Sequence, residues 1–461
     1  MLPRRIKRES RLRGDDMAEN AIEPTSTEKK GTITLRGAVF IGIGSMVGAG
    51  IFALFGEAGA IAGAAVWVSF LVGGVIALLQ GYSFAKLGAR YPSAGGLIAW
   101  IVRGYGSGLF TGGVVLLGYF SVIIVTAMVA VSFGNYATSL FLGEGAPQIW
   151  AKIFAIGIVV VLTFINSIGA EAVSRAQTAI VTIVLVILSS FAIAMLLQMN
   201  VSLLAPASYP PMSFILASVA LTFFAYLGFG VISFSGGDIK DPGKNMPRAM
   251  YIAIGFTMLL YIALAVGVFG TLTVEEVIAN ADTALAVAAL PIFGTFGYTM
   301  ISIAAIFATS GAINSQLYAS IGATYTMAKD GHLPPMFGLK RRRGGTQGLI
   351  ISALFIILLS VLFDVAAIAS IGSAVALVIY VLITIAHLRM ADETKASRPI
   401  LYLALVATSL AILLFAWYTL LTAPKTFAIL VATIILAWVV EAIWRWMSKR
   451  QLKTDELNIQ S

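Results

Sequence analysis

The stretch Gly42-Ile-Gly-Ser-Met-Val-Gly-Ala-Gly50 places four glycines within nine residues, in the middle of the apolar segment 34–55. A second glycine-rich stretch, Phe224-Ala-Tyr-Leu-Gly-Phe-Gly230, lies in the apolar segment 214–235 and is followed by Gly236 and Gly237. Each glycine weakens a helix by about 1 kcal/mol relative to alanine. The sequence therefore predicts two apolar helices that are interrupted near their middles.

Apolar segments continue along nearly the whole chain after Thr32. A segment of about 20 apolar residues is long enough to cross a hydrocarbon core. Twelve such spans are predicted, at residues 34–55, 62–87, 110–141, 149–168, 176–199, 214–235, 249–272, 293–327, 348–363, 365–387, 400–421 and 427–447. The composition agrees, because 59% of the residues are hydrophobic and only 11% are charged. We expect an all-α integral membrane protein of about twelve transmembrane helices, with the amphipathic segment 95–105 along an interface.

The basic residues are distributed unevenly among the connections between these spans. With the N-terminus inside, every Lys and Arg except Lys152 and Lys425 falls on the inner side. The positive-inside rule then predicts that both termini are cytoplasmic in a plasma membrane, and the short loops favour a bacterial inner membrane. The net charge of +9 does not indicate a nucleic-acid partner, because the basic residues lie between apolar spans and not on one folded face.

Groups that carry enzyme or metal chemistry are scarce. The chain has no cysteine, and its two histidines, His332 and His387, fall at the inner ends of spans. Paired carboxylates, or a nucleophile with its base at membrane depth, are not evident. The sequence therefore predicts no catalytic residue, metal site or cofactor. No predicted helix shows the sustained polar face of a channel, whereas a transporter-like sensor remains an alternative.

The two interrupted spans, the first and the sixth, point to a binding site. In lipid, backbone that leaves the helix must line a protein cavity, so a pair of such spans indicates a site where they meet. Their separation by five spans predicts two five-helix repeats of opposite orientation, followed by two peripheral helices. The expected divisions are a disordered cytoplasmic tail 1–33, repeats 34–199 and 214–388, a peripheral pair 400–447 and a tail 448–461. Alternatively, Gly44 and Gly48 only allow close helix packing.

Five motifs in order along residues 34–340 carry a family resemblance. They are Gly44-Ser-Met-Val-Gly-Ala-Gly-Ile-Phe52, Leu87-Gly-Ala-Arg-Tyr-Pro-Ser-Ala-Gly-Gly96, the Phe224-Ala-Tyr-Leu-Gly-Phe core, Asp238-Ile-Lys-Asp-Pro242 with Asn245-Met-Pro247, and Met327-Ala-Lys-Asp-Gly-His-Leu-Pro334. The sequence resembles the amino acid/polyamine/organocation superfamily of secondary transporters. The resemblance implies an inverted five-plus-five fold with broken first and sixth helices, and amino acid transport by alternating access.

The resemblance also implies a substrate site made largely of backbone. The substrate carboxylate is expected at the N–H groups of Ala49 and Gly50, where the positive end of a half-helix favours an anion. The ammonium group is expected at carbonyls of Met46, Phe224 and Leu227, with Phe224 also closing over the substrate. The full set of expected substrate contacts is Ser45, Met46, Gly48, Ala49, Gly50, Ile51, Phe224, Tyr226, Leu227, Gly228 and Gln316.

Departures from the family pattern bear on substrate and coupling. Gly230 stands where some relatives carry an acid, and spans one, three, six and eight contain no mid-membrane Asp or Glu. Because an unpaired cation is costly there, a neutral or small amino acid is favoured, with a cationic amino acid or polyamine as the alternative. Val184 stands where proton-coupled relatives carry a lysine, and Thr309 and Ser310 match hydroxyls of sodium-coupled members. A coupling proton, sodium or counter-substrate therefore stays open.

A cluster of charged residues is predicted near the inner ends of the spans. Its expected members are Glu171, Arg175, Asp238, Lys240 and Arg248. These side chains could form ion pairs that hold an inner gate shut. The alternative is ordinary solvated loop charge, which contributes little.

Overall fold

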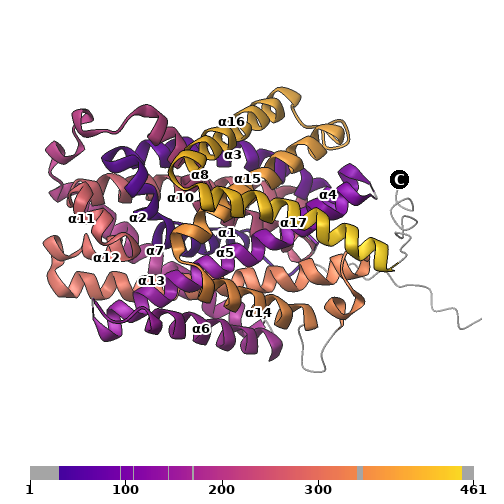
Figure 1. Cartoon of the computed structure of the whole chain (residues 1–461), viewed down its shortest axis with the longest axis horizontal. Helices are drawn as coiled ribbons and strands as arrows, with labels where there is room; N and C mark the ends of the chain where they lie inside the picture. Colours follow the sequence, from indigo (N-terminus) through magenta and orange to yellow (C-terminus); the bar gives the residue numbers. More distant parts are fainter. Residues whose placement is uncertain are drawn as a thin grey trace, which may run out of the picture.

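The computed structural model describes residues 31–93, 95–106, 108–143, 145–168, 171–339 and 346–448, with side chains for all of these except residues 168, 171–177 and 448. Regular structure in this part of the chain is helical, apart from one isolated bridge between Ile33 and Ile239. The helices run along the long axis of the molecule (Figure 1). One end carries α11 (Val274–Ala279) and α12 (Ala284–Val287), and the other carries α4 (Leu97–Tyr105). We call these the α11 end and the α4 end.

Ten helical segments of the described chain are long and apolar enough to cross a membrane. They are α2 (Ile51–Ala62) with α3 (Val66–Arg90), α5 (Leu109–Leu142), α6 (Ile149–Ile168), α7 (Glu171–Gln198), α8 (Met212–Ala225) with α9 (Val231–Phe234), α10 (Pro242–Phe269), α13 (Leu290–Lys329), α15 (Val365–Arg389), α16 (Arg398–Thr422) and α17 (Pro424–Ser448). Two shorter apolar helices, α1 (Leu35–Ala49) and α14 (Gln347–Leu362), complete the bundle. The predicted all-α membrane class is confirmed.

Both predicted interruptions are present. α1 ends at Ala49 and α2 begins at Ile51, so the first apolar segment changes helix at Gly50. The sixth loses its α-helical form after Ala225 and passes through the 3₁₀ turn η4 (Leu227–Gly230) before α9. The clusters of glycine explain both positions, because glycine, which lacks a Cβ, stabilises a regular helix less than alanine does.

Two further corners have local causes. Gly63 adopts a φ of +54°, which glycine reaches at little cost, and it separates α2 from α3. Asp364 separates α14 from α15 because its side chain accepts a 2.8 Å hydrogen bond from the N–H of Ala367, which caps α15. The break predicted at this acid between residues 348 and 387 is therefore confirmed.

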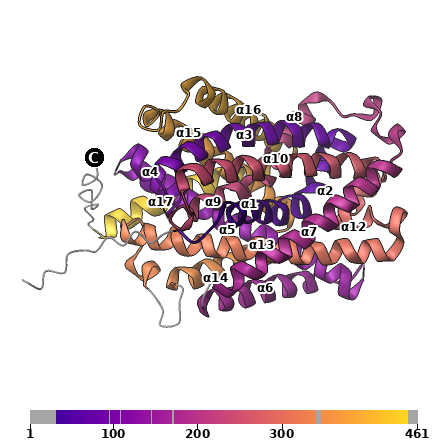
Figure 2. The same ribbon diagram turned by 180° about the vertical axis from the view of Figure 1, so that it is seen from behind.

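α1 lies in the middle of the bundle and packs mainly on α10 and α13, as both views indicate (Figure 2). The short α4 buries Leu97, Ile98, Trp100 and Ile101, in agreement with the predicted amphipathic segment. In contrast, α16 and α17 expose large apolar side chains, with Leu413 67% and Trp446 83% exposed. Such surfaces suit lipid, whereas the centre of the bundle is formed by α1 and its neighbours.

A buried chain of polar side chains ties α16 to the bundle. Gln80 on α3 donates a 2.8 Å hydrogen bond to Thr408 on α16 and accepts a 2.9 Å bond from Thr384 on α15. One turn further along α3, Ser83 lies 2.8 Å from the ring of His387. Buried polar groups are costly when unpaired, so these contacts fix the three helices relative to one another.

Candidate substrate site

The interruption at Gly50 is a kink and not an open gap. The N–H of Gly50 still donates a 2.6 Å hydrogen bond to the carbonyl of Met46, and the N–H of Leu54 donates a 2.8 Å bond to the carbonyl of Gly50. Gly50 itself has φ −94° and ψ −77°, outside the usual helical angles. Of the two N–H groups expected to hold a carboxylate, that of Gly50 is thus occupied by the helix in this structure.

Tyr261 on α10 holds the kink. Its hydroxyl donates a 2.6 Å hydrogen bond to the carbonyl of Met46 and lies 3.4 Å from the carbonyl of Ala225. These two carbonyls close the last turns of α1 and α8, so one side chain bridges both interrupted helices. Tyr261 is fully buried. Sequence analysis missed it, because a lone tyrosine in an apolar helix gives no local signal.

The two interrupted helices touch through glycine. A Cβ built on Gly228 would lie 2.3 Å from the backbone N of Met46, and one built on Gly48 would lie 2.1 Å from the carbonyl oxygen of Ala308 on α13. A Cβ on Gly50 would lie 2.3 Å from the hydroxyl of Tyr261 and 2.5 Å from the carbonyl oxygen of Ala225. Close packing, one of the two interpretations of these glycines, is therefore confirmed, and the packing also joins α1 to η4.

Ser45 lies at this junction with an unused hydroxyl. It is fully buried on α1, next to Met46, and its Oγ has no hydrogen-bond partner among the described residues. Ala49 and Ile51, on either side of the kink, are also buried, at 4% and 0% exposure. A buried polar atom without a partner costs free energy, so a hydroxyl in this position suits a ligand that supplies one.

Phe224 and Gln316 are buried on the other two helices of the expected site, α8 and α13. A Cβ on Gly372 of α15 would lie 2.6 Å from the ring of Phe224 and 2.9 Å from Ile124 of α5, so the ring is held between α8, α15 and α5. Phe224 is 3% and Gln316 of α13 is 5% exposed. The amide of Gln316 makes no hydrogen bond to the described residues, which leaves it available to a ligand.

Tyr226 and Leu227 have different surroundings. The hydroxyl of Tyr226 donates a 2.9 Å hydrogen bond to the carbonyl of Phe70 on α3, which directs it into a contact between helices. Leu227 is buried at 8% exposure. At Gly230, a Cβ would lie 2.9 Å from the hydroxyl of Tyr380, so an acid at this position would meet that hydroxyl.

The hydroxyls expected near a sodium site both bond to carbonyls of α13 itself. Thr309 donates a 2.6 Å hydrogen bond to the carbonyl of Ala305, and Ser310 donates a 2.7 Å bond to the carbonyl of Ile306. Each oxygen keeps lone pairs that a cation could use. The adjacent contact of Gly48 with Ala308 brings this stretch of α13 beside α1.

The cluster expected at the inner gate is only partly described. The side chains of Glu171 and Arg175 lie outside the described residues. Asp238 accepts a 3.3 Å hydrogen bond from Tyr318, and its backbone pairs with Ile33. Among the described residues, Lys240 and Arg248 form no ion pair with it.

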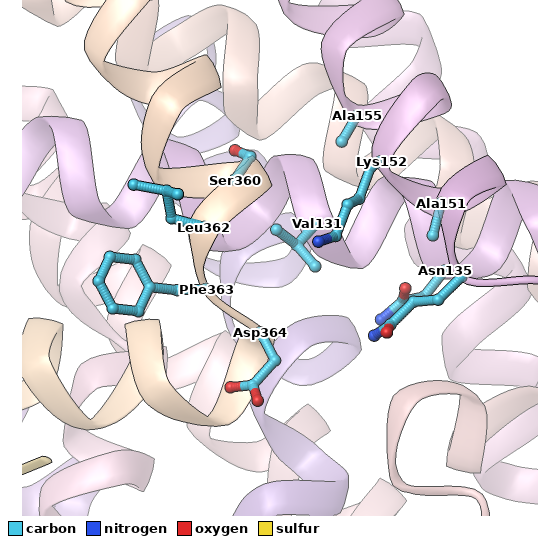
Figure 3. A pocket seen from close by; sticks show the side chains of 10 residues that line it. Val131, Asn135, Ala151, Lys152, Ala155, Ser360, Leu362, Phe363 and Asp364 are labelled. Carbon is cyan, nitrogen blue, oxygen red and sulfur yellow. The ribbon is translucent and has the colours of Figure 1, made fainter. Parts of the chain in front are cut away.

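Two adjoining cavities open near the α11 end. One, of about 190 Å³, is lined by Asn135, Lys152 and Asp364 among others (Figure 3). The other, of about 360 Å³, is lined by Glu57, Asn135 and Asp282 among others. Asn135 and Gln148 line both cavities, so the two lie side by side with a shared wall. We call the combined space the acidic vestibule.

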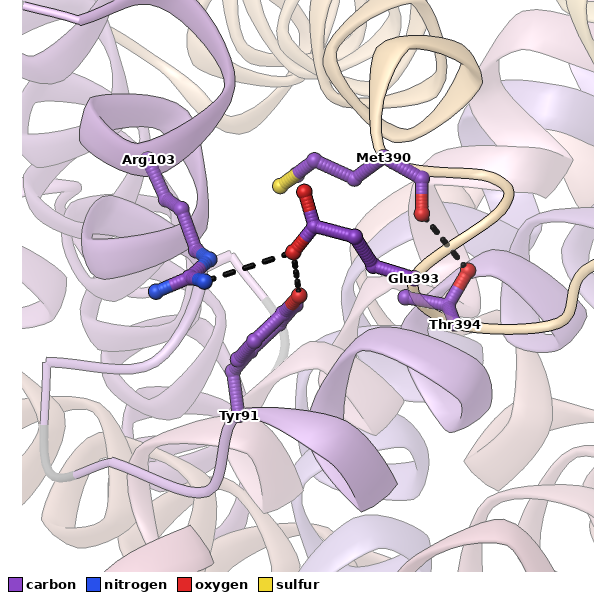
Figure 4. A network of polar contacts seen from close by, with 5 residues as sticks. All are labelled: Tyr91, Arg103, Met390, Glu393 and Thr394. Carbon is purple, nitrogen blue, oxygen red and sulfur yellow. Dashed lines mark hydrogen bonds and ion pairs between the residues drawn. The ribbon is translucent and has the colours of Figure 1, made fainter. Parts of the chain in front are cut away.

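A different cluster joins elements at the α4 end. Glu393, in the loop between α15 and α16, accepts hydrogen bonds from the hydroxyl of Tyr91 and, at 3.3 Å, from the guanidinium of Arg103 on α4 (Figure 4). That guanidinium also lies 4.1 Å from the centre of the Tyr91 ring. The bond from Tyr91, assisted by Arg103, holds the pKa of Glu393 below its usual range. Sequence analysis missed this cluster because its members are about 300 residues apart.

Known proteins match the chain over most of its length. A family model described as amino acid permease matches residues 33–443. The inner membrane transport protein YbaT of Escherichia coli is 35% identical over 408 residues, which cover 88% of this chain and 95% of that protein.

More distant relatives are named for their substrates. The serine/threonine exchanger SteT of Bacillus subtilis is 28% identical over 66% of this chain and 70% of its own length. The vacuolar cationic amino acid transporter 4 of Arabidopsis thaliana is 31% identical over 65% of this chain and 52% of its own length. With the family model spanning both interrupted helices and all the long apolar segments, the chain belongs to the amino acid permease family of multi-pass membrane transporters, within the amino acid/polyamine/organocation superfamily.

Proposed function

We propose that the chain is a secondary active transporter that carries amino acids, with neutral or small ones favoured, across a plasma membrane by alternating access. The observation that carries the proposal is the contact of Gly228 with the backbone of Met46, which brings the two interrupted helices together in the buried centre. Backbone that leaves regular helix geometry inside a membrane protein is typical of a binding site.

The proposed site uses groups from three helices. Ser45, Met46 and the kink at Gly50 come from α1 and α2, while Phe224 comes from α8 and Gln316 from α13. Ser45 Oγ and the Gln316 amide supply polar contacts, and opening of the kink would free N–H groups for the substrate carboxylate. The Phe224 ring covers the site from the side of α15.

A neutral substrate is supported by the absence of charge at the junction. α1, α5, α8 and α13 contain no Asp or Glu, and glycine stands at position 230, beside Tyr380, where some relatives carry an acid. A cationic side chain would therefore have no counter-charge. SteT, a serine/threonine exchanger, is a relative with small polar substrates, whereas the Arabidopsis relative keeps a cationic substrate as the alternative.

Three modes of energy coupling stay open, and the residues of the site bear on each of them. Thr309 and Ser310 on α13 would supply hydroxyl oxygens to a sodium ion beside α1, in which case uptake is sodium-driven. Val184 on α7 is buried and apolar, which argues against a lysine-type proton carrier at that point. Exchange against an amino acid inside the cell needs neither sodium nor a proton. In that mode the counter-substrate replaces the ion gradient.

We further propose that the chain crosses the membrane twelve times. This number counts α1–α2 as one span and α3 as the next, and adds α14 to the remaining long segments. The spans would form two inverted repeats at 34–199 and 214–388 and a peripheral pair at 400–447. The pairing of α3 with α10, and of α1 with η4, supports equivalent roles for the two halves. Because Lys and Arg gather at the α4 end, that end and both termini face the cytoplasm, and the α11 end faces outward.

Uptake by the purified protein in proteoliposomes tests the function. Labelled neutral and cationic amino acids are compared, with and without unlabelled amino acid inside, under sodium and proton gradients. Saturable uptake of a neutral amino acid that is lost in a folded Gly50→Val variant supports the proposal. Uptake of lysine or arginine in preference to every neutral amino acid contradicts the substrate class. Binding without uptake in a folded protein identifies a sensor instead.

A further inference from the structure

The acidic vestibule at the α11 end gathers three carboxylates from separate parts of the chain. Glu57 belongs to α2, Asp282 to the 3₁₀ turn η6 (Ala281–Thr283) and Asp364 to the corner between α14 and α15. The charges of Asp282 and Asp364 both act on Glu57. Figure 3 shows Asp364 and Lys152 on the wall of the smaller cavity. Three acids and one lysine give this space a net negative charge.

The carboxylates are not neutralised within the described part of the protein. Glu57, Asp282 and Asp364 form no ion pair there, and Lys152 forms none either. Asp282 is exposed to the cavity. The surrounding protein still displaces enough water to raise the pKa of its carboxyl, although the hydrogen bond with the side chain of Asn135 acts in the other direction. Like charges held near one another are unfavourable, so a cation that enters the vestibule is stabilised.

The polar lining fits a ligand with N–H donors. Besides the acids, Asn135 offers an amide oxygen, and Thr138 lines the larger cavity with a hydroxyl that has no hydrogen-bond partner in the part of the chain that the structure describes. Thr138 is 7% exposed, so this unpaired oxygen is almost wholly buried. Within the described residues, no three acids or histidines lie close enough to hold a metal ion. The carboxylates, the amide oxygen and this hydroxyl are all acceptors, which suits an organic ammonium group that donates three hydrogen bonds.

The vestibule is connected to the proposed substrate site by one helix. Glu57 lies seven residues after Gly50, which corresponds to about 10 Å along α2. The neighbouring Gly56 is packed so closely on η6 that a Cβ would lie 2.1 Å from the carbonyl oxygen of Ala281. α2 thus forms a wall that is shared by the vestibule and the kink.

We propose that the acidic vestibule is a binding site for the ammonium group of amines and amino acids, occupied before the substrate reaches the central site. The proposal rests on the proposed function for its role in transport, whereas binding itself is independent of transport. Every zwitterionic amino acid carries an ammonium group, so the site accepts neutral amino acids as well as cationic ones. Its net charge makes simple amines bind more tightly than zwitterions.

Titration of the purified full-length protein with n-butylammonium chloride, followed calorimetrically, tests the site. Saturable binding is expected to weaken at least tenfold in the double variant Glu57→Gln with Asp282→Asn. The control, Glu275→Gln, alters a surface acid of α11 that does not line the vestibule and should bind as wild type does. No saturable binding by wild type, or equal binding by the double variant, overturns the proposal.

Two further arms keep the test decisive. Lys152→Gln removes the one cation of the vestibule and should tighten butylammonium binding by about threefold, a gain that misfolding cannot produce. Tetramethylammonium, which lacks N–H donors, should bind more weakly than butylammonium, and equal binding overturns the assignment of an ammonium site. If butylammonium binds but no amino acid is transported, the proposed function fails and the ammonium site in the vestibule stands. If amino acids are transported but butylammonium does not bind, the proposed function stands and the ammonium site fails.

Discussion

The hydroxyl of Tyr261 lies 2.6 Å from the carbonyl oxygen of Met46 and so ties α10 to the last turn of α1. The same carbonyl accepts the N–H of Gly50, so it takes part in two hydrogen bonds at the kink. Opening of the kink would require this pair of bonds to separate. The bond from Tyr261 therefore opposes the movement of α2 that the proposed transport requires, and we call it a control point for this movement.

Replacement of Tyr261 by Phe tests this control point. Loss of one buried hydrogen bond is expected to lower the free energy of unfolding by about 1 kcal/mol, since Met46 keeps its bond to Gly50. The measurement is thermal unfolding of the purified protein together with initial rates of uptake. Tyr251→Phe on the same helix is the control, because that hydroxyl has no hydrogen bond to the described residues. Equal behaviour of the two variants contradicts a special role for Tyr261.

Gly228→Ala tests the contact between the interrupted helices. The new methyl group would lie 2.3 Å from the backbone N of Met46, which cannot turn aside as a side chain can. A loss of about 1–3 kcal/mol in the free energy of unfolding is expected, with loss of substrate binding. Gly255→Ala on α10 has open space around its Cβ and should be neutral or stabilising, by up to about 1 kcal/mol. Unfolding curves of both variants make the comparison.

Sequence alone was sufficient for the features that depend on local chemistry. Apolar length gave the long helices, and clustered glycine gave the interruptions at Gly50 and at η4, because both are properties of neighbouring residues. The acid at Asp364 marked a helix break for the same reason, as a short polar side chain caps the next helix. These predictions needed no knowledge of which helices meet.

The contacts that decide the candidate sites were beyond sequence reasoning because they join distant residues. Tyr261 reaches Met46 across 215 positions, and nothing around either residue distinguishes it from an ordinary core residue. Glu57, Asp282 and Asp364 lie in three connections that are far apart in the sequence, so their convergence appears only in the fold. The hydrogen bond from the hydroxyl of Tyr226 to the carbonyl of Phe70 is of the same kind, since the motif that suggested Tyr226 as a substrate contact does not reveal it.

The cluster of Tyr91, Arg103 and Glu393 should make the packing at the α4 end depend on pH. Because the pKa of Glu393 is lowered in the folded protein, its ionised form contributes stability that is present above the unfolded pKa and is lost as the pH falls through the folded one. Tyr91→Phe removes the first cause of the shift. The difference in unfolding temperature between wild type and this variant should therefore be present at pH 7 and shrink in acid below the usual range of Glu. A difference that is constant over this range would assign the effect of Tyr91 to packing.

Ser45→Ala tests whether the hydroxyl of Ser45 binds the substrate or only serves the stability of the fold. The Ser45 hydroxyl is buried and has no partner within the described ranges, so its removal costs no hydrogen bond there and should leave the free energy of unfolding unchanged or raise it by up to about 1 kcal/mol. If the hydroxyl bonds to the substrate, the same variant should raise the KM for uptake about fivefold or more, which corresponds to about 1 kcal/mol. Ser302→Ala on α13 is the matched control, because that hydroxyl is equally buried and unpaired but is not among the predicted substrate contacts. A stable Ser45→Ala protein with an unchanged KM would show that the substrate does not use the Ser45 hydroxyl, whereas a raised KM in that variant alone would assign the unpaired oxygen to the ligand.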